Sequence, residues 1–96
     1  MGNSDNKIAI VTGATGGIGF EVAKRLGKEG FTVILNGIED LAGAEKVEWL
    51  TAKGIKAEYY GFDVTNEEDV NKNIKAIGEK FGKIDVVVNN AGGLGG

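Results

Sequence analysis

The sequence contains neither cysteine nor histidine, and these two absences remove several kinds of chemistry. Without cysteine the chain forms no disulfide and has no thiol nucleophile; without histidine it has no imidazole base. Both residues are also the usual ligands of zinc and other transition metals, so no metal site is expected. Enzyme classes that depend on these groups are therefore excluded for these 96 residues.

Long apolar runs and clusters of basic residues are also absent. The apolar runs are too short to cross a bilayer, so no membrane partner is expected. The net charge is -3, and nucleic-acid binding needs clustered Lys and Arg to displace counterions, so no nucleic-acid partner is expected either. The opening MGNSDN has no feature of a signal or transit peptide, which favours a cytoplasmic location.

The residues that are present predict one small α/β domain. Short β-branched or apolar segments predict strands at residues 7–11, 31–36, 55–62 and 83–90. A segment with helical spacing follows each of the first three, and these helices are expected to end near Gly30, Gly54 and Gly82. Because the crossovers in such a series are right-handed, the sheet is predicted to be parallel, with helices in layers and the order 3-2-1-4. This is a truncated doubly wound, Rossmann-like fold, with the more polar third strand at an edge.

The spacing of apolar residues predicts which side of each helix is buried. The expected buried residues are Ile18, Val22 and Leu26 in the first helix, Leu41, Ala44, Val47 and Leu50 in the second, and Val70, Ile74, Ile77 and Phe81 in the third. A capping box of Thr65 and Glu68 is expected to begin the third helix. The nearby acids Glu67 and Asp69 favour that helix start and are not interpreted as metal ligands.

The stretch TGATGGIG at residues 12–19 connects the first strand to the first helix. Gly13 permits a tight turn, Gly17 lets backbone approach a ligand, and Gly19 lets the helix lie close to the strand. The first-turn amides and the helix dipole can then bind a pyrophosphate. A tight connection with no ligand is the alternative. The position at the carboxyl end of a βαβ series, without the Lys-Ser/Thr pair of a triphosphatase loop, favours a dinucleotide.

Three motifs, in the same order and on corresponding elements, resemble the short-chain dehydrogenase/reductase family. The family's TGxxxGxG corresponds to Thr12, Gly13, Gly17 and Gly19, its acid after the third strand to Asp63, and its NNAG to Asn89, Asn90, Ala91 and Gly92. The resemblance implies a Rossmann-type fold, an NAD or NADP cofactor, and hydride transfer between a carbonyl and an alcohol.

The resemblance also implies roles for individual residues. Thr15 is expected at the adenosine ribose, the Ile18 amide at the pyrophosphate, Asp63 and Val64 beside the adenine, Asn90, Ala91 and Gly92 along the ribose, and Asn89 as a tie within the sheet. A simple loop acid is the alternative for Asp63, and capping of the strand end is the alternative for the asparagines.

The preferred cofactor is expected to be NAD. NAD-binding members of the family usually have an acid at the end of the second strand, and Gly37 stands there instead. Members that bind NADP usually have a basic residue nearby, but this chain has Ile38 and no cation in the glycine turn. Glu39 and Asp40 would repel a 2′-phosphate, and this repulsion favours NAD over NADP.

The catalytic residues of the family, a Ser and a Tyr-x-x-x-Lys, have no counterpart here. Asp63 and Val64 lie four residues after Tyr59 and Tyr60, so both tyrosines are interpreted as packing residues. The chain is therefore expected to be an inactive cofactor-binding half of an enzyme. A minimal or redesigned Rossmann scaffold is the alternative, and a half-enzyme with a separately supplied second half is another.

The expected organisation is a flexible tail at residues 1–6, a dinucleotide-binding half-domain at 7–92 and a truncated glycine-rich loop at 93–96. Without a fifth strand, the three valines of the fourth strand would form an apolar sheet edge, which is a template for pairing with another chain. Self-association through this strand is therefore expected.

Overall fold

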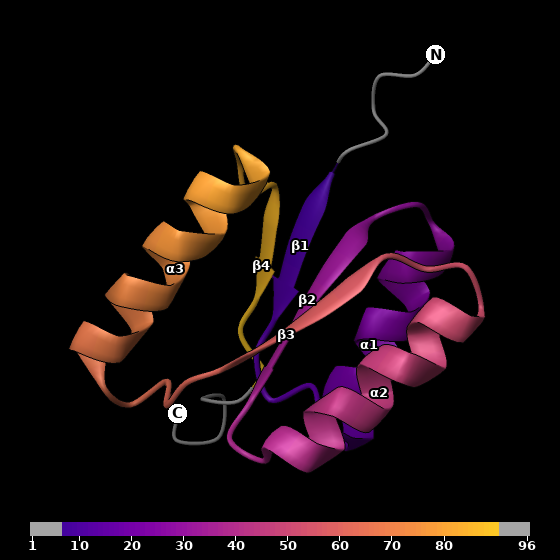
Figure 1. The fold of residues 1–96 in the computed structure, drawn as a ribbon, viewed down its shortest axis with the longest axis horizontal. Coiled ribbons are helices and arrows are strands. Elements are labelled where there is room, and N and C mark those ends of the chain that lie inside the picture. The colour runs from indigo at the N-terminus through magenta and orange to yellow at the C-terminus, as the bar shows by residue number, and fades with distance from the viewer. Residues whose placement is uncertain (1–6, 91–96) are drawn as a thin grey trace.

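The computed structural model describes residues 7–90, and the expectations for the tail 1–6, for Ala91 and Gly92, and for the loop 93–96 lie outside this range. The described elements are β1 (Ile8–Val11), α1 (Gly17–Lys28), β2 (Thr32–Gly37), α2 (Asp40–Ala52), β3 (Ala57–Gly61), α3 (Glu67–Phe81) and β4 (Val86–Val88). The four strands are parallel and follow the order β3-β2-β1-β4 (Figure 1). The predicted topology and fold class are confirmed.

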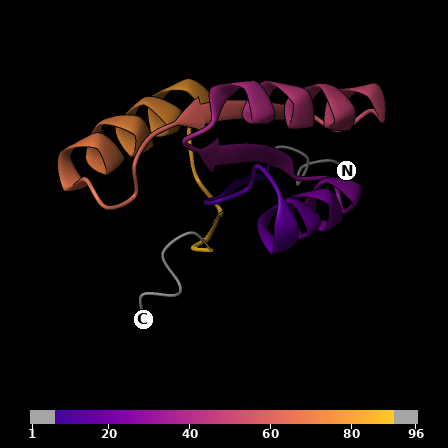
Figure 2. The ribbon, with the colours of Figure 1, turned by 90° about the horizontal axis from the view of Figure 1, so that it is seen from below.

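The sheet separates two layers of helix. α1 and α2 lie side by side on one face and α3 lies alone on the other, as both ribbon views show (Figures 1 and 2). Neighbouring residues of a strand point to opposite faces, so the buried pair Ile34 and Leu35 divides between the layers. Leu35 packs in the core beneath α1 and α2, and Ile34 packs beneath α3 with Ile77.

α1 and α2 pack through residues that differ in part from those predicted. Ile18 and Leu41 are 74 % and 85 % exposed, and Ala44 is exposed too. The buried positions of these two helices are Gly19, Ala23 and Gly27 in α1, and Gly43 and Leu50 in α2. The prediction was wrong at these positions because it followed large apolar residues, whereas close packing on this face uses small ones.

α3 packs on the sheet through Ile74, Ile77 and Phe81 of the predicted residues, but it begins with a different cap. Asn66 is the N-cap, and its Oδ1 accepts from the Asp69 amide at 3.0 Å. Thr65 is not the cap because its hydroxyl donates to Asp63 instead, at 2.6 Å. The expected capping box was therefore wrong by one residue. The helix ends at Gly82, whose left-handed conformation is the usual helix stop.

Candidate functional site

The glycine turn after β1 is fastened to the end of β2. Gly13 has φ 61°, a left-handed conformation that favours glycine, and its amide donates to Asn36 Oδ1 at 3.3 Å. The next amide, of Ala14, donates to the Asn36 carbonyl at 2.8 Å. The predicted tight turn at Gly13 is confirmed. The amides of Gly13 and Ala14 both donate to Asn36 and so hold the turn in place.

Asn36 was not recognised in the sequence, although it connects three parts of the site. Its side chain is 1 % exposed, and its Nδ2 donates to the carbonyls of Phe62 at 2.9 Å and Tyr60 at 3.3 Å. One buried amide therefore joins the glycine turn to the loop that carries Asp63. The available signal was a polar residue in a strand otherwise buried by apolar ones, since a buried amide needs hydrogen-bond partners.

Gly17 begins α1 at the carboxyl edge of the sheet. A side chain at Gly16 or Gly17 would meet no described atom within 4 Å, so the backbone here is open to a ligand. The first-turn amides of a helix lack acceptors within the helix, and α1 has no acidic residue in its first turn. This arrangement fits an anionic group and in particular the pyrophosphate of a dinucleotide.

The first turn of α1 lies against the glycine turn and the segment that follows β4. A methyl group at Gly19 would overlap the Gly13 carbonyl and would fall 2.9 Å from Asn90 Nδ2. Asn90 donates from Nδ2 to the Gly13 carbonyl at 3.2 Å and from its amide to Thr12 Oγ1 at 2.8 Å. The glycine motif and the asparagine motif, 77 residues apart, therefore form one unit. The predicted close approach at Gly19 is confirmed.

Both asparagines that follow β4 take part in holding the strand ends. Thr12 Oγ1 donates to Asn89 Oδ1 at 3.4 Å, which agrees with Asn89 as a tie within the sheet. Asn90 makes more of these contacts than Asn89, so capping of the strand end explains its side chain. Its backbone still passes the mouth of the glycine turn, where a ribose was predicted.

Asp63 lies in the exposed loop between β3 and α3. Its Oδ1 accepts from the Thr65 hydroxyl at 2.6 Å and the Thr65 amide at 2.9 Å, and these bonds lower the pKa of the carboxyl. The group is thus an anion at neutral pH. It directly follows Phe62, whose carbonyl accepts from the buried Asn36 side chain. Val64, beside it, is half-buried.

Thr15 lies over the end of β2. A methyl group at Gly37 would fall 2.5 Å from Thr15 Cγ2, so this threonine occupies the space that the glycine leaves. The predicted residues Gly13, Thr15, Gly17 and Asp63 therefore all lie at the carboxyl ends of β1, β2 and β3. Ile18 contributes its amide there, while its side chain points into solvent.

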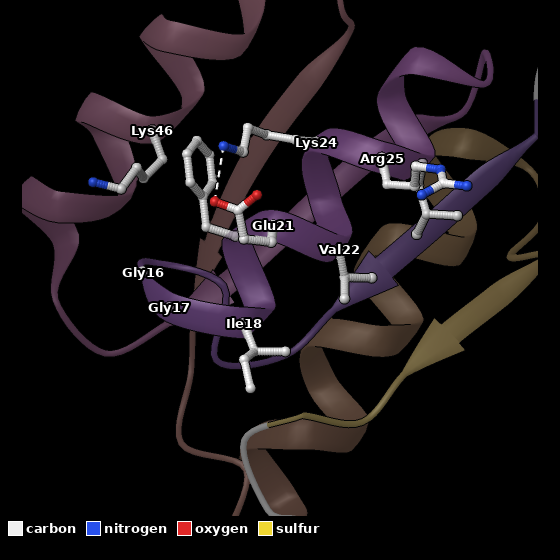
Figure 3. Close-up of a pocket in the computed structure, with 10 residues that line it drawn as sticks. Gly16, Gly17, Ile18, Glu21, Val22, Lys24, Arg25 and Lys46 are labelled. Atoms are coloured by element: carbon white, nitrogen blue, oxygen red, sulfur yellow. Dashed lines mark ion pairs between the residues drawn. The ribbon is translucent and has the colours of Figure 1, made fainter.

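An open depression of about 830 Å³ extends from Gly16 and Gly17 along the outer side of α1. Figure 3 shows Ile18 and Val22 projecting from the helix on the side away from Lys46, and the pair of Glu21 and Lys24, 2.9 Å apart. The depression shares only its glycine end with the predicted site, which lies at the sheet edge.

Two further kinds of site are not found in the described part of the chain. Residues 7–90 contain no cluster of three acidic residues placed to hold a metal ion. Within the same range, no helix has the length and apolar character needed to span a bilayer.

Comparison with known proteins gives matches along the chain. A family model described as short chain dehydrogenase matches residues 7–96. A 3beta-hydroxysteroid dehydrogenase of Mediterraneibacter gnavus is 47 % identical over 95 residues, which are 99 % of this chain and 34 % of that protein. A putative ketoacyl reductase of Streptomyces coelicolor is 38 % identical over 96 residues, 100 % of this chain and 37 % of that protein. The chain thus spans about a third of the length of these relatives.

Solved structures also match this chain. A variant actinorhodin polyketide ketoreductase with NADPH superposes with a TM-score of 0.86 at 37 % identity, covering 95 % of this chain and 35 % of that one. A metagenomic short-chain oxidoreductase in complex with NADP also has a TM-score of 0.86, at 30 % identity, covering 88 % of this chain and 38 % of that one.

Proposed function

Because the chain belongs to the short-chain dehydrogenase family, we propose that it is the dinucleotide-binding part of an oxidoreductase. When bound, a nicotinamide dinucleotide would donate hydride to a carbonyl in its reduced form or accept hydride from an alcohol in its oxidised form. The observation that supports this proposal most directly is the junction of the glycine turn with the segment after β4, made by Asn90 and the Gly13 carbonyl. This junction leaves the open backbone at Gly16 and Gly17 at the edge where α/β folds bind nucleotides.

The residues that would hold the dinucleotide lie at three places along this edge. The amides of Gly17, Ile18 and Gly19 would bind the pyrophosphate, and Thr15 would contact the adenosine ribose. Asp63, kept ionised by its bonds from Thr65, would accept from the exocyclic amine of adenine beside Val64. Asn90, with Ala91 and Gly92 of the sequence, would pass along the ribose.

Catalysis by these 96 residues alone is not expected. The Tyr59 hydroxyl donates to Asp40 at 3.0 Å, and burial, the hydrogen bond to Asp40 and the charges of Asp40 and Glu39 raise its pKa to about 12. A general acid works best with a pKa near the working pH, so this phenol is unsuited to proton transfer. We propose that the chain binds the cofactor and turns over no substrate.

Titration of the chain with NAD and NADP tests the proposal. We expect saturable binding by calorimetry, with shifts of the backbone amide signals of residues 13–19. Asp63→Ala should weaken binding by removing the acceptor for adenine, whereas Glu67→Gln, an exposed acid at the start of α3, should not. Turnover of a carbonyl substrate by the purified chain would contradict the proposed inactivity.

The scaffold interpretation predicts a different outcome for the same titration. If nucleotide binding is vestigial, no amide in residues 13–19 will respond at millimolar cofactor. That result would favour a folding or assembly scaffold over the cofactor-binding proposal.

We also propose that the chain self-associates through β4. Among residues 7–90, β1 is the only strand that pairs with β4, and Val87 is 55 % exposed. An unpaired strand edge is a template for a second chain. Sedimentation should show a dimer that Val87→Lys disrupts, and a monomer at high protein concentration would contradict this proposal.

A further inference from the structure

β2 ends in Asn36 followed by Gly37, the single Asn-Gly pair of the sequence. Such a pair is chemically labile in an open chain, because glycine has no side chain to hinder attack by its backbone nitrogen. The nitrogen of Gly37 gives up its proton and bonds to Cγ of Asn36, whose amide nitrogen leaves as ammonia. Water then opens the cyclic imide and yields aspartate or isoaspartate. The end of β2 therefore carries the sequence of a spontaneous modification site.

The fold requires both members of this pair. Asn36 needs an amide at its end, because Nδ2 donates to the carbonyls of Phe62 and Tyr60. Gly37 leaves no room for a larger residue, since a methyl group there would fall 2.5 Å from Thr15 Cγ2. The two requirements fall on adjacent residues. A less reactive pair would therefore disturb either the link to β3 or the packing of the glycine turn.

The folded sheet opposes the reaction in three ways. Closing the imide ring requires the Asn36 side chain to rotate towards the Gly37 nitrogen, and this rotation breaks its three hydrogen bonds. The backbone of Gly37 is itself paired, because its carbonyl accepts from the Phe62 amide at 3.2 Å. Asn36 is also 1 % exposed, so the water that opens the imide is excluded. The reaction therefore needs the end of β2 to separate from its neighbours.

We propose that Asn36–Gly37 is a deamidation site that the folded sheet keeps unreactive and that separation of the end of β2 from the glycine turn and β3 makes reactive. The product cannot rebuild the same contacts. A carboxylate at position 36 has no hydrogen to donate, so the carbonyls of Phe62 and Tyr60 would face a negative charge. Isoaspartate would also add a methylene to the backbone and shift the residues after it from their register with β3. A chain that opens and reacts therefore loses the connection between the glycine turn and the loop after β3, whether or not a cofactor binds there.

The experiment incubates the whole chain at mildly alkaline pH, with and without enough urea to unfold it, and follows each asparagine by peptide mapping and mass spectrometry. In urea, Asn36 should convert faster than Asn71, an asparagine followed by Lys that is exposed in the folded chain. Gly37→Ala should slow the conversion in urea, where its effect does not depend on folding. Without urea, the rate at Asn36 should fall at least about a hundredfold, because only the small opened fraction reacts.

A second comparison tests whether opening at the glycine turn releases the reaction. Gly19→Ala would press on the Gly13 carbonyl, so Asn36 should convert about tenfold faster in this variant than in the wild type, both without urea. Gly16→Ala, whose methyl group would meet nothing, should match the wild type. If thermal unfolding shows that Gly19→Ala is not folded, the wild type in urea below its transition replaces it, and the rate should rise with urea.

Three results would overturn the proposal. Asn36 could survive in the unfolded chain as long as Asn71 does, so that the pair is not a deamidation site. Its rate could be the same with and without urea, so that the sheet gives no protection. It could also be unchanged in folded Gly19→Ala, or in low urea where that variant does not fold, so that opening of the turn does not control the reaction.

Discussion

The two faces of the sheet are packed in different ways. On the face covered by α1 and α2, glycines lie at the contacts: Gly27 meets the side chain of Ile55, and Gly43 meets the ring of Tyr59. On the other face, α3 packs through the large side chains of Ile74, Ile77 and Phe81, and a side chain at Gly78 would meet no described atom within 4 Å.

The difference shows which layer tolerates little change in the size of its side chains. Contacts through glycine bring helix backbone close to the sheet and leave little freedom, whereas large apolar side chains can adjust to small changes. The glycine turn, Thr15 and the start of α2 belong to the closely packed layer. The layer that would hold the cofactor is therefore the one with the least room for substitution.

The largest effects are expected from Leu35→Ala and Ile34→Ala, two fully buried neighbours on β2 that point to opposite faces. Both should lower the free energy of unfolding by about 2 to 5 kcal/mol, the usual range for such truncations. Leu35→Ala should cost more, because the close layer cannot collapse into the cavity. Urea unfolding measures both. Equal losses would mean that the two layers are equally rigid.

Gly19→Ala should have the next largest effect. Overpacking should lower the free energy of unfolding by about 1 to 3 kcal/mol. The added methyl group would overlap the Gly13 carbonyl and press on Asn90. Gly16→Ala is the control, because its methyl group would meet nothing and φ 178° is extended backbone. Similar stability of the two variants by urea unfolding would show that α1 can move away from β1.

A pH effect should be visible at Tyr59 in a Tyr60→Phe background, where it is the only remaining tyrosine. Its pKa of about 12 lies above the ordinary 10.0, mainly because of burial and the bond to Asp40. The raised value stabilises the folded state fully below pH 10.0, and this contribution is lost as pH rises through about 12. Tyrosinate absorbance gives the pKa, and unfolding at several pH values gives the stability. Titration near 10.0 would contradict the buried, bonded phenol.

The smallest effect, and one of opposite sign, is expected from Gly78→Ala. The position lies inside α3 with space for a methyl group, so alanine should stabilise the helix by about 0.5 to 1 kcal/mol. Gly43→Ala, in the close layer, should destabilise instead because the methyl group meets the Tyr59 ring. Thermal unfolding distinguishes the two. A Gly43→Ala variant more stable than the wild type would contradict the closer packing of the layer that contains α1 and α2.

Element order, strand order and the glycine turn could be predicted because they depend on local patterns. Buried strands need short β-branched runs, and right-handed crossovers leave few topologies. The positive φ at Gly13 and the contact at Gly19 also follow from the place of these glycines between a strand and a helix.

The packing surfaces of α1 and α2 could not be predicted in the same way. Periodicity of large residues pointed to Ile18, Leu41 and Ala44, but a closely packed helix turns its small residues to the sheet. The places of Asn36 and Asp40 depend on partners more than 15 residues away, at Phe62 and Tyr59. Such contacts exist only once β2 and β3 are paired.

The position of Trp49, the single tryptophan of the chain, gives the molecule an internal optical reporter. Its ring meets that of Phe20 edge-on at 5.6 Å, across the boundary between α2 and α1, with the Lys24 ammonium 5.3 Å from its centre. Emission from this indole should therefore change when α1 separates from α2. It should not change when structure is lost only in the opposite layer. A fluorescence transition that precedes or follows the loss of circular dichroism would reveal that the two layers melt separately.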